Sequence, residues 1–442
     1  MQFNSISFIF GFFPAFLLVY FCVRQELRRG CLVLFSLLFY ALSAGDNLWW
    51  VAILLAAALF SYGVCCGLSR SRSPLLLGFG LTALTGVLVF FKLWQGGRLL
   101  PPGMSFYLFQ SAAYLIDCYR GRLTIGSLPC FFEELLLFPK LLSGPLMDPV
   151  ELRKQSRNCL RSFDNIREGL LTLILGLSLK VLLANRLGGL FGQLYVVGFE
   201  NISTGFAWMA LVAWAMQLYF DFYGYSLMAM GLGRIIGYRL PSNFLDPYAS
   251  RSVSEFYRRW HVTLGAWFRE YLYIPLGGNR HGNLRTILNL AVVWLFTGLW
   301  HGVGGNYLLW AGVLFFFILN ERLWLGNLLK KTKVFCHVYT ILAILVSWIP
   351  FAVGDWNNML TFMGRLFGLT PALVDATDFI TWGRDYWQLL VCGVIFATPW
   401  PGKLWEKIRT KPLADVLCFG LFWVVVFYIA TSAQDPFLYF AY

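Results

Sequence analysis

Charged residues are scarce in this 442-residue chain. Asp, Glu, Lys and Arg together make up 13% of it, against about 25% in a typical soluble protein. Hydrophobic residues make up 58%, and the mean hydropathy is +0.64. The chain also lacks a long hydrophilic stretch, since the longest, at about residues 148–167, has room for only one amphipathic helix. These absences exclude a soluble protein with several domains. They predict a polytopic, all-α integral membrane protein with one membrane domain over residues 1–442.

The cysteines form no pattern that is typical of metal binding. None of the ten stands in a CxxC pair, and most lie inside or at the ends of apolar runs. We therefore expect buried thiols that pack as small hydrophobic side chains, with neither a zinc site nor an extracellular disulfide framework.

Apolar runs that are long enough to cross a membrane recur along the whole chain. A spanning helix needs about 20 mostly apolar residues, which predicts about eleven spans. They lie at about 5–23, 30–45, 48–66, 74–94, 168–185, 205–230, 286–303, 305–325, 335–353, 386–400 and 413–431. The first has no basic residue before it and no small-residue cleavage site after it, so we expect a retained span. The runs at 103–117 and 130–147 are ambiguous and suggest partial or re-entrant segments, which are tolerated only inside the protein or along a cavity.

The net charge of +13 comes from basic residues that gather in a few of the connections between these spans. The groups are Arg24/Arg28/Arg29, Arg70/Arg72, Arg120/Arg122, Arg153–Arg161, Arg234–Arg285, Lys330/Lys331/Lys333 and Lys403–Lys411. Cytoplasmic loops of membrane proteins carry an excess of Lys and Arg, so we expect these groups to face the cytoplasm. The N-terminus and the loop around Asp355 then face outside, and nucleic acid is not an expected partner.

Residues 252–283 contain the first of two unusual histidine-bearing motifs, SVSEFYRRWHVTLGAWFREYLYIPLGGNRHGN. Ser252 and Glu255 have the spacing of a capping box at a helix N-terminus, and apolar residues then recur at helical spacing. We expect one amphipathic helix on the cytoplasmic side, with His261 in its middle. Two interpretations remain open: the helix lies in the headgroup layer, or it lines the mouth of a cavity where its arginines meet an anionic substrate.

A carboxylate, Asp221, lies inside the expected span at 205–230, with Gln217 and Tyr225 close to it in sequence. A carboxylate in a bilayer is costly, and it is usually paired or functional. One interpretation is a hydrogen bond that fixes helix packing, and the other is a polar wall of a substrate tunnel. Asn243 belongs to the loop that follows this span.

The second motif places His301 at the end of the apolar run TILNLAVVWLFTGLW and before the glycines at 302, 304 and 305. Imidazole exchanges protons near neutral pH, and an ionisable residue in a span is a functional candidate. The alternative is a histidine that donates to a backbone carbonyl at a helix end. Trp300 and the glycines leave room for a ligand, which favours a functional role. The other two of the four histidines, His281 and His337, stand in basic loops and are expected at the surface.

Several blocks of the sequence resemble the membrane-bound O-acyltransferase superfamily, most closely its bacterial branch that O-acetylates polysaccharides such as alginate and peptidoglycan. The blocks are RRWHVTLGAWFREYLYIPLGGN, NLAVVWLFTGLWHG, PPGMSFYLFQSAAYLIDCYRG and LFPKLLSGPLMDP. The likeness covers residues 1–325 well and the last hundred weakly. It implies a helical membrane fold with a funnel or tunnel that reaches a histidine deep in the membrane. The invariant histidine of the family falls on His301. The second falls on His261, where the family frequently has Asn or Asp and this branch has His.

The resemblance implies acyl transfer from a cytoplasmic thioester, such as acetyl-CoA, to a hydroxyl, with no further cofactor. His301 and His261 are the expected catalytic residues. The expected substrate- or donor-binding residues are Arg258, Arg259, Trp260, Arg269, Asn243, Asp221, Gln217, Tyr225 and Trp300. No metal site is expected. The expected partners are membrane lipids, the cytoplasmic acyl donor and an extracytoplasmic SGNH-type transferase, at the plasma membrane.

Other functions stay open, the weakest of which is a flippase partner without catalysis. The first is D-alanyl transfer to teichoic acid from a carrier protein. The second, of another class, is a proton-coupled transporter in which Asp221 and His301 form a relay. Under the predicted topology His301 lies near the outer end of its span and His261 on the cytoplasmic side, so an acyltransferase needs a tunnel that joins the two.

Overall fold

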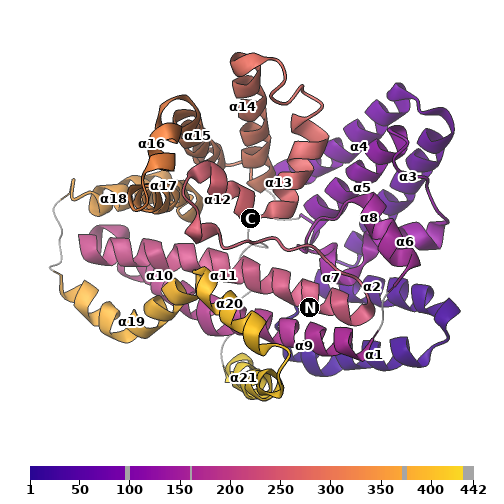
Figure 1. Ribbon diagram of the computed structural model, residues 1–442, viewed down its shortest axis with the longest axis horizontal. Coiled ribbons are helices and arrows are strands. Elements are labelled where there is room, and N and C mark those ends of the chain that lie inside the picture. The colour runs from indigo at the N-terminus through magenta and orange to yellow at the C-terminus, as the bar shows by residue number, and fades with distance from the viewer. Residues whose placement is uncertain (95–99, 160–161, 371–375, 432–442) are drawn as a thin grey trace. The chain divides into compact units, whose positions relative to one another are not determined.

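The computed structural model describes residues 1–94, 100–159, 162–370 and 376–431 (Figure 1). Every regular element in this part of the chain is a helix, apart from an isolated antiparallel bridge between Phe244 and Trp260. The predicted all-α class is therefore confirmed.

The residues fall into two compact units, each built from separate stretches of the chain. The first unit contains residues 1–177, 224–242 and 418–442, and the second contains 178–223 and 243–417. The long helix α11, Thr204–Ile236, contributes residues to both. One membrane domain over 1–442 remains a prediction.

The first unit has long helices near its N-terminus and shorter ones after them. Its elements are η1 (Ser7–Phe12), α1 (Phe13–Cys22), η2 (Gln25–Leu27), α2 (Arg28–Ala44), α3 (Trp49–Ser71), α4 (Pro74–Leu93), α5 (Met104–Tyr119), α6 (Leu128–Leu136), α7 (Phe138–Leu141), α8 (Pro149–Arg157), α9 (Phe163–Ser178) and most of α21 (Pro412–Thr431). The ambiguous run at 103–117 forms α5, most of whose side chains are buried. The run at 130–147, an ambiguous segment in the sequence, forms the short helices α6 and α7 and an irregular stretch.

Two buried carboxylates on α6 bind side chains of neighbouring helices in the first unit. Glu134 of α6 is fully buried and accepts hydrogen bonds from Tyr114 (2.8 Å) and Arg153 (2.9 Å). Its neighbour Glu133 accepts from Tyr238 (2.6 Å) and pairs with Arg29 at 2.6 Å. A buried charge that is paired and hydrogen-bonded is tolerated, whereas a lone one is not, so these bonds fix how α2, α5, α6 and α8 pack.

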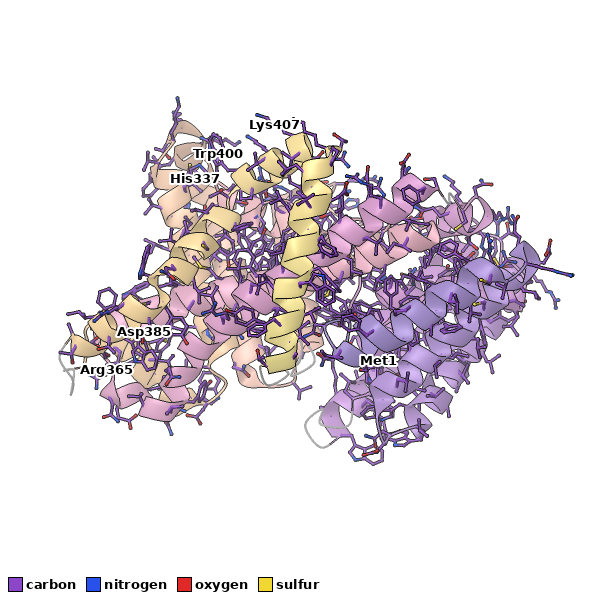
Figure 2. All side chains as sticks on the ribbon, turned by 90° about the horizontal axis from the view of Figure 1, so that it is seen from below. Met1, His337, Arg365, Asp385, Trp400 and Lys407 are labelled. Atoms are coloured by element: carbon purple, nitrogen blue, oxygen red, sulfur yellow. The ribbon has the colours of Figure 1, made fainter. Side chains whose placement is uncertain are left out.

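The second unit carries both unusual histidines. Its elements are η4 (Leu179–Ala184), α10 (Asn185–Val197), η5 (Phe199–Asn201), the first part of α11, η6 (Pro247–Ala249), α12 (Val253–Arg259), α13 (Val262–Phe268), η7 (Arg269–Tyr273), α14 (Gly282–His301), α15 (Gly305–Asn320), η8 (Glu321–Leu325), α16 (Gly326–Lys331), α17 (Phe335–Ala352), α18 (Trp356–Leu366), α19 (Thr377–Phe396) and α20 (Pro399–Ile408). Figure 2 shows His337, Trp400 and Lys407 at one end of this unit and Arg365 and Asp385 at the other. Which side of the membrane each of these ends faces remains a prediction.

Eight helices in the described part of the chain are long and apolar enough to cross a membrane. They are Gln25–Ala44, Trp49–Ser71, Pro74–Leu93, Phe163–Val197, Gly282–His301, Gly305–Lys331, Phe335–Ala352 and Pro412–Thr431. A shorter apolar helix, Ser7–Cys22, matches the first expected span, and α11 matches the one at 205–230. The multi-pass character is confirmed, but two boundaries were wrong. The run at 168–185 is part of one continuous helix of 35 residues. The run at 386–400 is not one helix, because α19 ends at Phe396 and α20 begins at Pro399.

Candidate active site

His301 is the last residue of α14, and aromatic rings from three helices surround it. The centroid of its ring lies 4.5 Å from that of Trp300, 4.8 Å from Trp310 on α15 and 5.1 Å from Phe351 on α17. All three contacts are edge-to-face, a favourable geometry for aromatic pairs. The histidine stays half-buried, so the rings orient the imidazole without sealing it off.

His261 does not lie in the middle of a helix, and the expectation of one continuous amphipathic helix was wrong. The helix breaks after Arg259, and His261 has φ of 46° and ψ of 51°, a left-handed conformation. The cause is a segment distant from it in sequence. Leu245 N–H donates to the Arg259 carbonyl, and Val262 N–H donates to the Asn243 carbonyl, both at 3.0 Å. These bonds compete with the helical ones and stop the helix.

Asn243 holds the residues that flank this break. It is fully buried, and its Oδ1 accepts a hydrogen bond from the Thr263 hydroxyl at 2.6 Å, while its carbonyl binds the Val262 amide. Non-glycine residues in the left-handed region are uncommon and cluster at functional sites. The expected role of Asn243 in binding substrate remains a prediction, and the structure gives it a positioning role.

The His261 ring is enclosed by aromatic side chains. It is 5% exposed, and its centroid lies 4.7 Å from that of Phe222 and 6.0 Å from that of Trp300. This burial lowers the pKa of His261 to about 3, because an apolar environment disfavours the charged imidazolium. The ring is therefore neutral at physiological pH.

Trp300 brings the two motifs together. Its ring centroid lies 4.5 Å from that of His301 and 6.0 Å from that of His261. We expected the two histidines towards opposite sides of the membrane. The structure instead places them around one tryptophan, although they are forty residues apart in sequence. Trp260, the neighbour of His261, extends the aromatic cluster, since its ring lies 5.3 Å from that of Trp348.

The three arginines that were expected to bind the donor differ in their surroundings. Arg259 is half-buried and pairs with Glu255 at 2.6 Å. Arg258 and Arg269 are exposed, and neither is paired with a carboxylate of the described residues. These two are therefore better placed than Arg259 to meet an anionic group.

Asp221 is paired, as a buried carboxylate should be, and its partner is a residue that the sequence analysis missed. It forms an ion pair with Lys180, and both side chains are almost fully buried. Lys180 lies in the π-helical turn η4, within the helix Phe163–Val197. Phe222, the residue after Asp221, contacts His261, so the pair anchors the part of α11 that supports this ring. A lysine inside an apolar run is the signal that could have revealed it.

The other two polar residues expected near Asp221 lie in different places. Gln217 packs against Gly188 so closely that a Cβ there would collide with its amide. Tyr225 belongs to the first unit, where its ring stacks on Phe3 at 5.1 Å. The structure therefore groups Gln217 with Asp221 and His261 in one unit and leaves Tyr225 outside that group.

Glu321 is a second residue that the sequence analysis missed. Its carboxylate accepts hydrogen bonds from Val253 N–H (2.5 Å), Ser254 N–H (2.9 Å) and the Ser254 hydroxyl (2.6 Å). These donors form the first turn of α12, which also has the predicted cap, since the Ser252 hydroxyl accepts from Glu255 N–H at 3.0 Å. A carboxylate at a helix N-terminus is stabilising, so Glu321 fixes the helix that leads to His261.

The remaining histidines differ from each other. His281 is exposed, as expected. His337 was expected at the surface of a loop, but it lies in the first turn of α17, half-buried, with its Nδ1 3.1 Å from the Ser250 carbonyl oxygen. Among the described residues, no three or more His, Cys, Asp or Glu side chains are grouped so that they could hold a metal ion.

The sequence is similar to known proteins over its whole length. A profile of the membrane-bound O-acyltransferase family matches residues 31–363. A probable alginate O-acetylase of Pseudomonas putida is 32% identical over the full length of both chains. A peptidoglycan O-acetyltransferase of Helicobacter pylori is 29% identical over 100% of this chain and 97% of its own. A teichoic acid D-alanyltransferase of Streptococcus thermophilus is 28% identical over 47% of this chain and 53% of its own.

Proposed function

Because the chain belongs to the membrane-bound O-acyltransferase family, we propose that it moves an acetyl group from a cytoplasmic thioester for O-acetylation of an extracytoplasmic polysaccharide. Acyl transfer is the chemistry of the family. The acetyl group and the polysaccharide are inferred from the functions of relatives that align over the whole chain. D-alanyl transfer is less favoured, because the D-alanyltransferase aligns over only 47% of the chain.

The observation that carries this proposal is the convergence of the two histidines on Trp300. An alcohol attacks a thioester carbonyl well only when a base removes its proton in the transition state. A positioned imidazole contributes roughly 10²–10⁴-fold to such a step. We assign this base to His301, which is half-buried and therefore reachable. His261 is buried and neutral, which suits a positioning role beside it.

The proposed acyl transfer needs one protein group, the imidazole of His301. The hydroxyl oxygen attacks the thioester carbonyl, His301 takes the hydroxyl proton, and the thiolate leaves and recovers a proton from the imidazolium. A covalent acyl-histidine is a less direct route, because it adds a second transfer.

Acetyl-CoA is the proposed donor, and its phosphates need cations at the entrance. Arg258 and Arg269 are exposed and close in sequence to His261, which favours them for this contact. In the proposed orientation they face the cytoplasm of a plasma-membrane protein, and the acetyl group passes to the outer side. The acceptor there is a polysaccharide hydroxyl or a serine of an SGNH-type transferase.

The test uses purified protein in liposomes with radiolabelled acetyl-CoA on one side only. We expect label to reach a soluble acceptor, such as deacetylated alginate with its transferase partner, only from acetyl-CoA at the face that carries Arg258. Equal transfer from both faces contradicts the proposed direction. No thioester consumption by the wild type under any arrangement contradicts the acetyl-CoA donor, and D-alanyl carrier protein is then the donor to test.

A further inference from the structure

The short helix α20 (Pro399–Ile408) contains no fully buried residue, and its most exposed large apolar side chains are Trp400 and Leu404. It follows α19 after two residues and precedes α21 by three. Its start is set locally, since Pro399 occupies the first helical position and the Thr398 hydroxyl accepts from Trp400 N–H at 3.4 Å. Trp405 and Ile408 are half-buried against the chain, whereas Trp400 and Leu404 gain little from packing against the described residues.

Two kinds of side chain run along α20 in adjacent stripes. Trp400 and Leu404, four residues apart, are 76% and 60% exposed. Lys403 and Lys407, also four apart, are exposed beside them, and neither is paired with a carboxylate of the described residues. The nearby Glu406 is neutralised by Arg409 at 2.8 Å. Residues four apart share one face of a helix, so an apolar stripe lies against a basic one.

The position of α20 matches the level at which a membrane span begins. In Figure 2, Trp400 and Lys407 lie at the same end of the second unit as His337. His337 is in the first turn of α17, a helix that is long and apolar enough to span a membrane. The start of such a helix lies at the boundary between hydrocarbon and headgroups. The end of α20 is also only four residues from Pro412, where the apolar helix α21 starts.

We propose that α20 lies in the headgroup layer and binds acidic phospholipid, with Lys403 and Lys407 on the phosphates and Trp400 and Leu404 inserted among the acyl chains. Tryptophan is favoured at this depth because its ring is amphipathic. Lysines beside an apolar stripe extend towards the headgroups, and basic residues next to a span attract anionic lipid. A soluble protein partner is less favoured, because Trp400 lies at the level where the hydrocarbon of the membrane begins.

α20 differs from the segment before His261, for which the headgroup layer was one of two interpretations. The segment before His261 buries Val253 and Phe256 completely and is bound by Glu321 through three hydrogen bonds. Its apolar face is therefore covered by protein. Trp400 and Leu404 of α20 are not covered by the described residues, so this face of α20 is open to lipid.

The first test measures bound lipid. The full-length protein is placed in nanodiscs of phosphatidylglycerol and phosphatidylcholine, and native mass spectrometry counts the lipids that are retained. Lys403→Gln with Lys407→Gln should lower the retained phosphatidylglycerol relative to phosphatidylcholine, by roughly fivefold for each lysine removed. The matched control is Glu406→Gln with Arg409→Gln, which removes the ion pair at the same helix without changing the net charge and should retain phosphatidylglycerol. Unchanged retention in the α20 variant, or an equal loss in the control, overturns the proposal.

The second test measures depth and does not depend on charge. Spin labels are attached in a cysteine-free background at Leu404→Cys and at Glu406→Cys, which lie on opposite faces of α20. The label at 404 should collide more with oxygen, which dissolves in lipid, and the label at 406 more with a water-soluble nickel complex. Equal access of the nickel complex to both labels shows that α20 stands in water and overturns the proposal.

Discussion

The left-handed backbone at His261 allows its structural and chemical roles to be measured apart. A residue with a Cβ costs about 1–2 kcal/mol in this conformation, whereas glycine pays no such cost. The ring offsets the cost through its contacts with Phe222 and Trp300, at about 0.5–1.5 kcal/mol for each favourable aromatic pair. His261→Ala keeps the backbone strain and loses the ring, while His261→Gly loses both.

We therefore expect His261→Gly to be more stable than His261→Ala by about 1 kcal/mol, although it deletes one more atom. His261→Asn should lie near glycine, because Asn tolerates the left-handed region. The assay is thermal unfolding of the purified variants in one detergent, beside acetyl transfer. All three should lose activity if the ring positions the substrate. If His261→Ala is as stable as His261→Gly, the conformation stores no strain and the reasoning is refuted.

The buried ring also predicts a dependence of stability on pH. Histidine has a pKa near 6.5 in an unfolded chain, and burial lowers the pKa of His261 to about 3 in the folded protein. The unfolded state therefore takes up the proton first as the pH falls. The contribution of His261 is complete above about pH 6.5 and is lost progressively towards pH 3. The stability advantage of the wild type over His261→Asn should narrow across this window, and a constant difference contradicts the buried neutral imidazole.

Three further outcomes follow from the site. His301→Ala should abolish acetyl transfer while the melting temperature stays within a few degrees of wild type; full activity rejects His301 as the base. Arg258→Gln with Arg269→Gln should raise the KM for acetyl-CoA more than it lowers kcat, since such contacts bind ground and transition states alike; a change in kcat alone counts against donor binding. Lys180→Met should destabilise the fold by about 3–5 kcal/mol, because it leaves Asp221 uncompensated, and adding Asp221→Leu should restore much of the loss. A double variant as unstable as the single one contradicts this account of the pair.

Local patterns in the sequence were sufficient for the helical class, for most of the expected spans and for the cap at Ser252. Each depends on residues within one helix. The length of an apolar run decides whether it spans a membrane, and a hydroxyl three residues before a backbone N–H decides where a helix starts. The two histidine motifs were also visible, because an imidazole inside an apolar run stands out without any knowledge of its neighbours.

Contacts between distant segments decided the rest. The break at His261 exists because residues 243–245 bind the backbone on either side of it, and helical spacing alone cannot reveal a competitor that arrives from another segment. Three further contacts join residues 39 to 68 positions apart: the ion pair of Lys180 with Asp221, the hydrogen bond of Glu321 to Val253 in α12, and the contact of His261 with Trp300. Hydrophobic periodicity records which face of a helix is buried, but not what covers it. The sequence was therefore sufficient to predict the chemistry of the site. Its geometry is set by the packing of helices against one another, and no sequence pattern indicates which helices pack together.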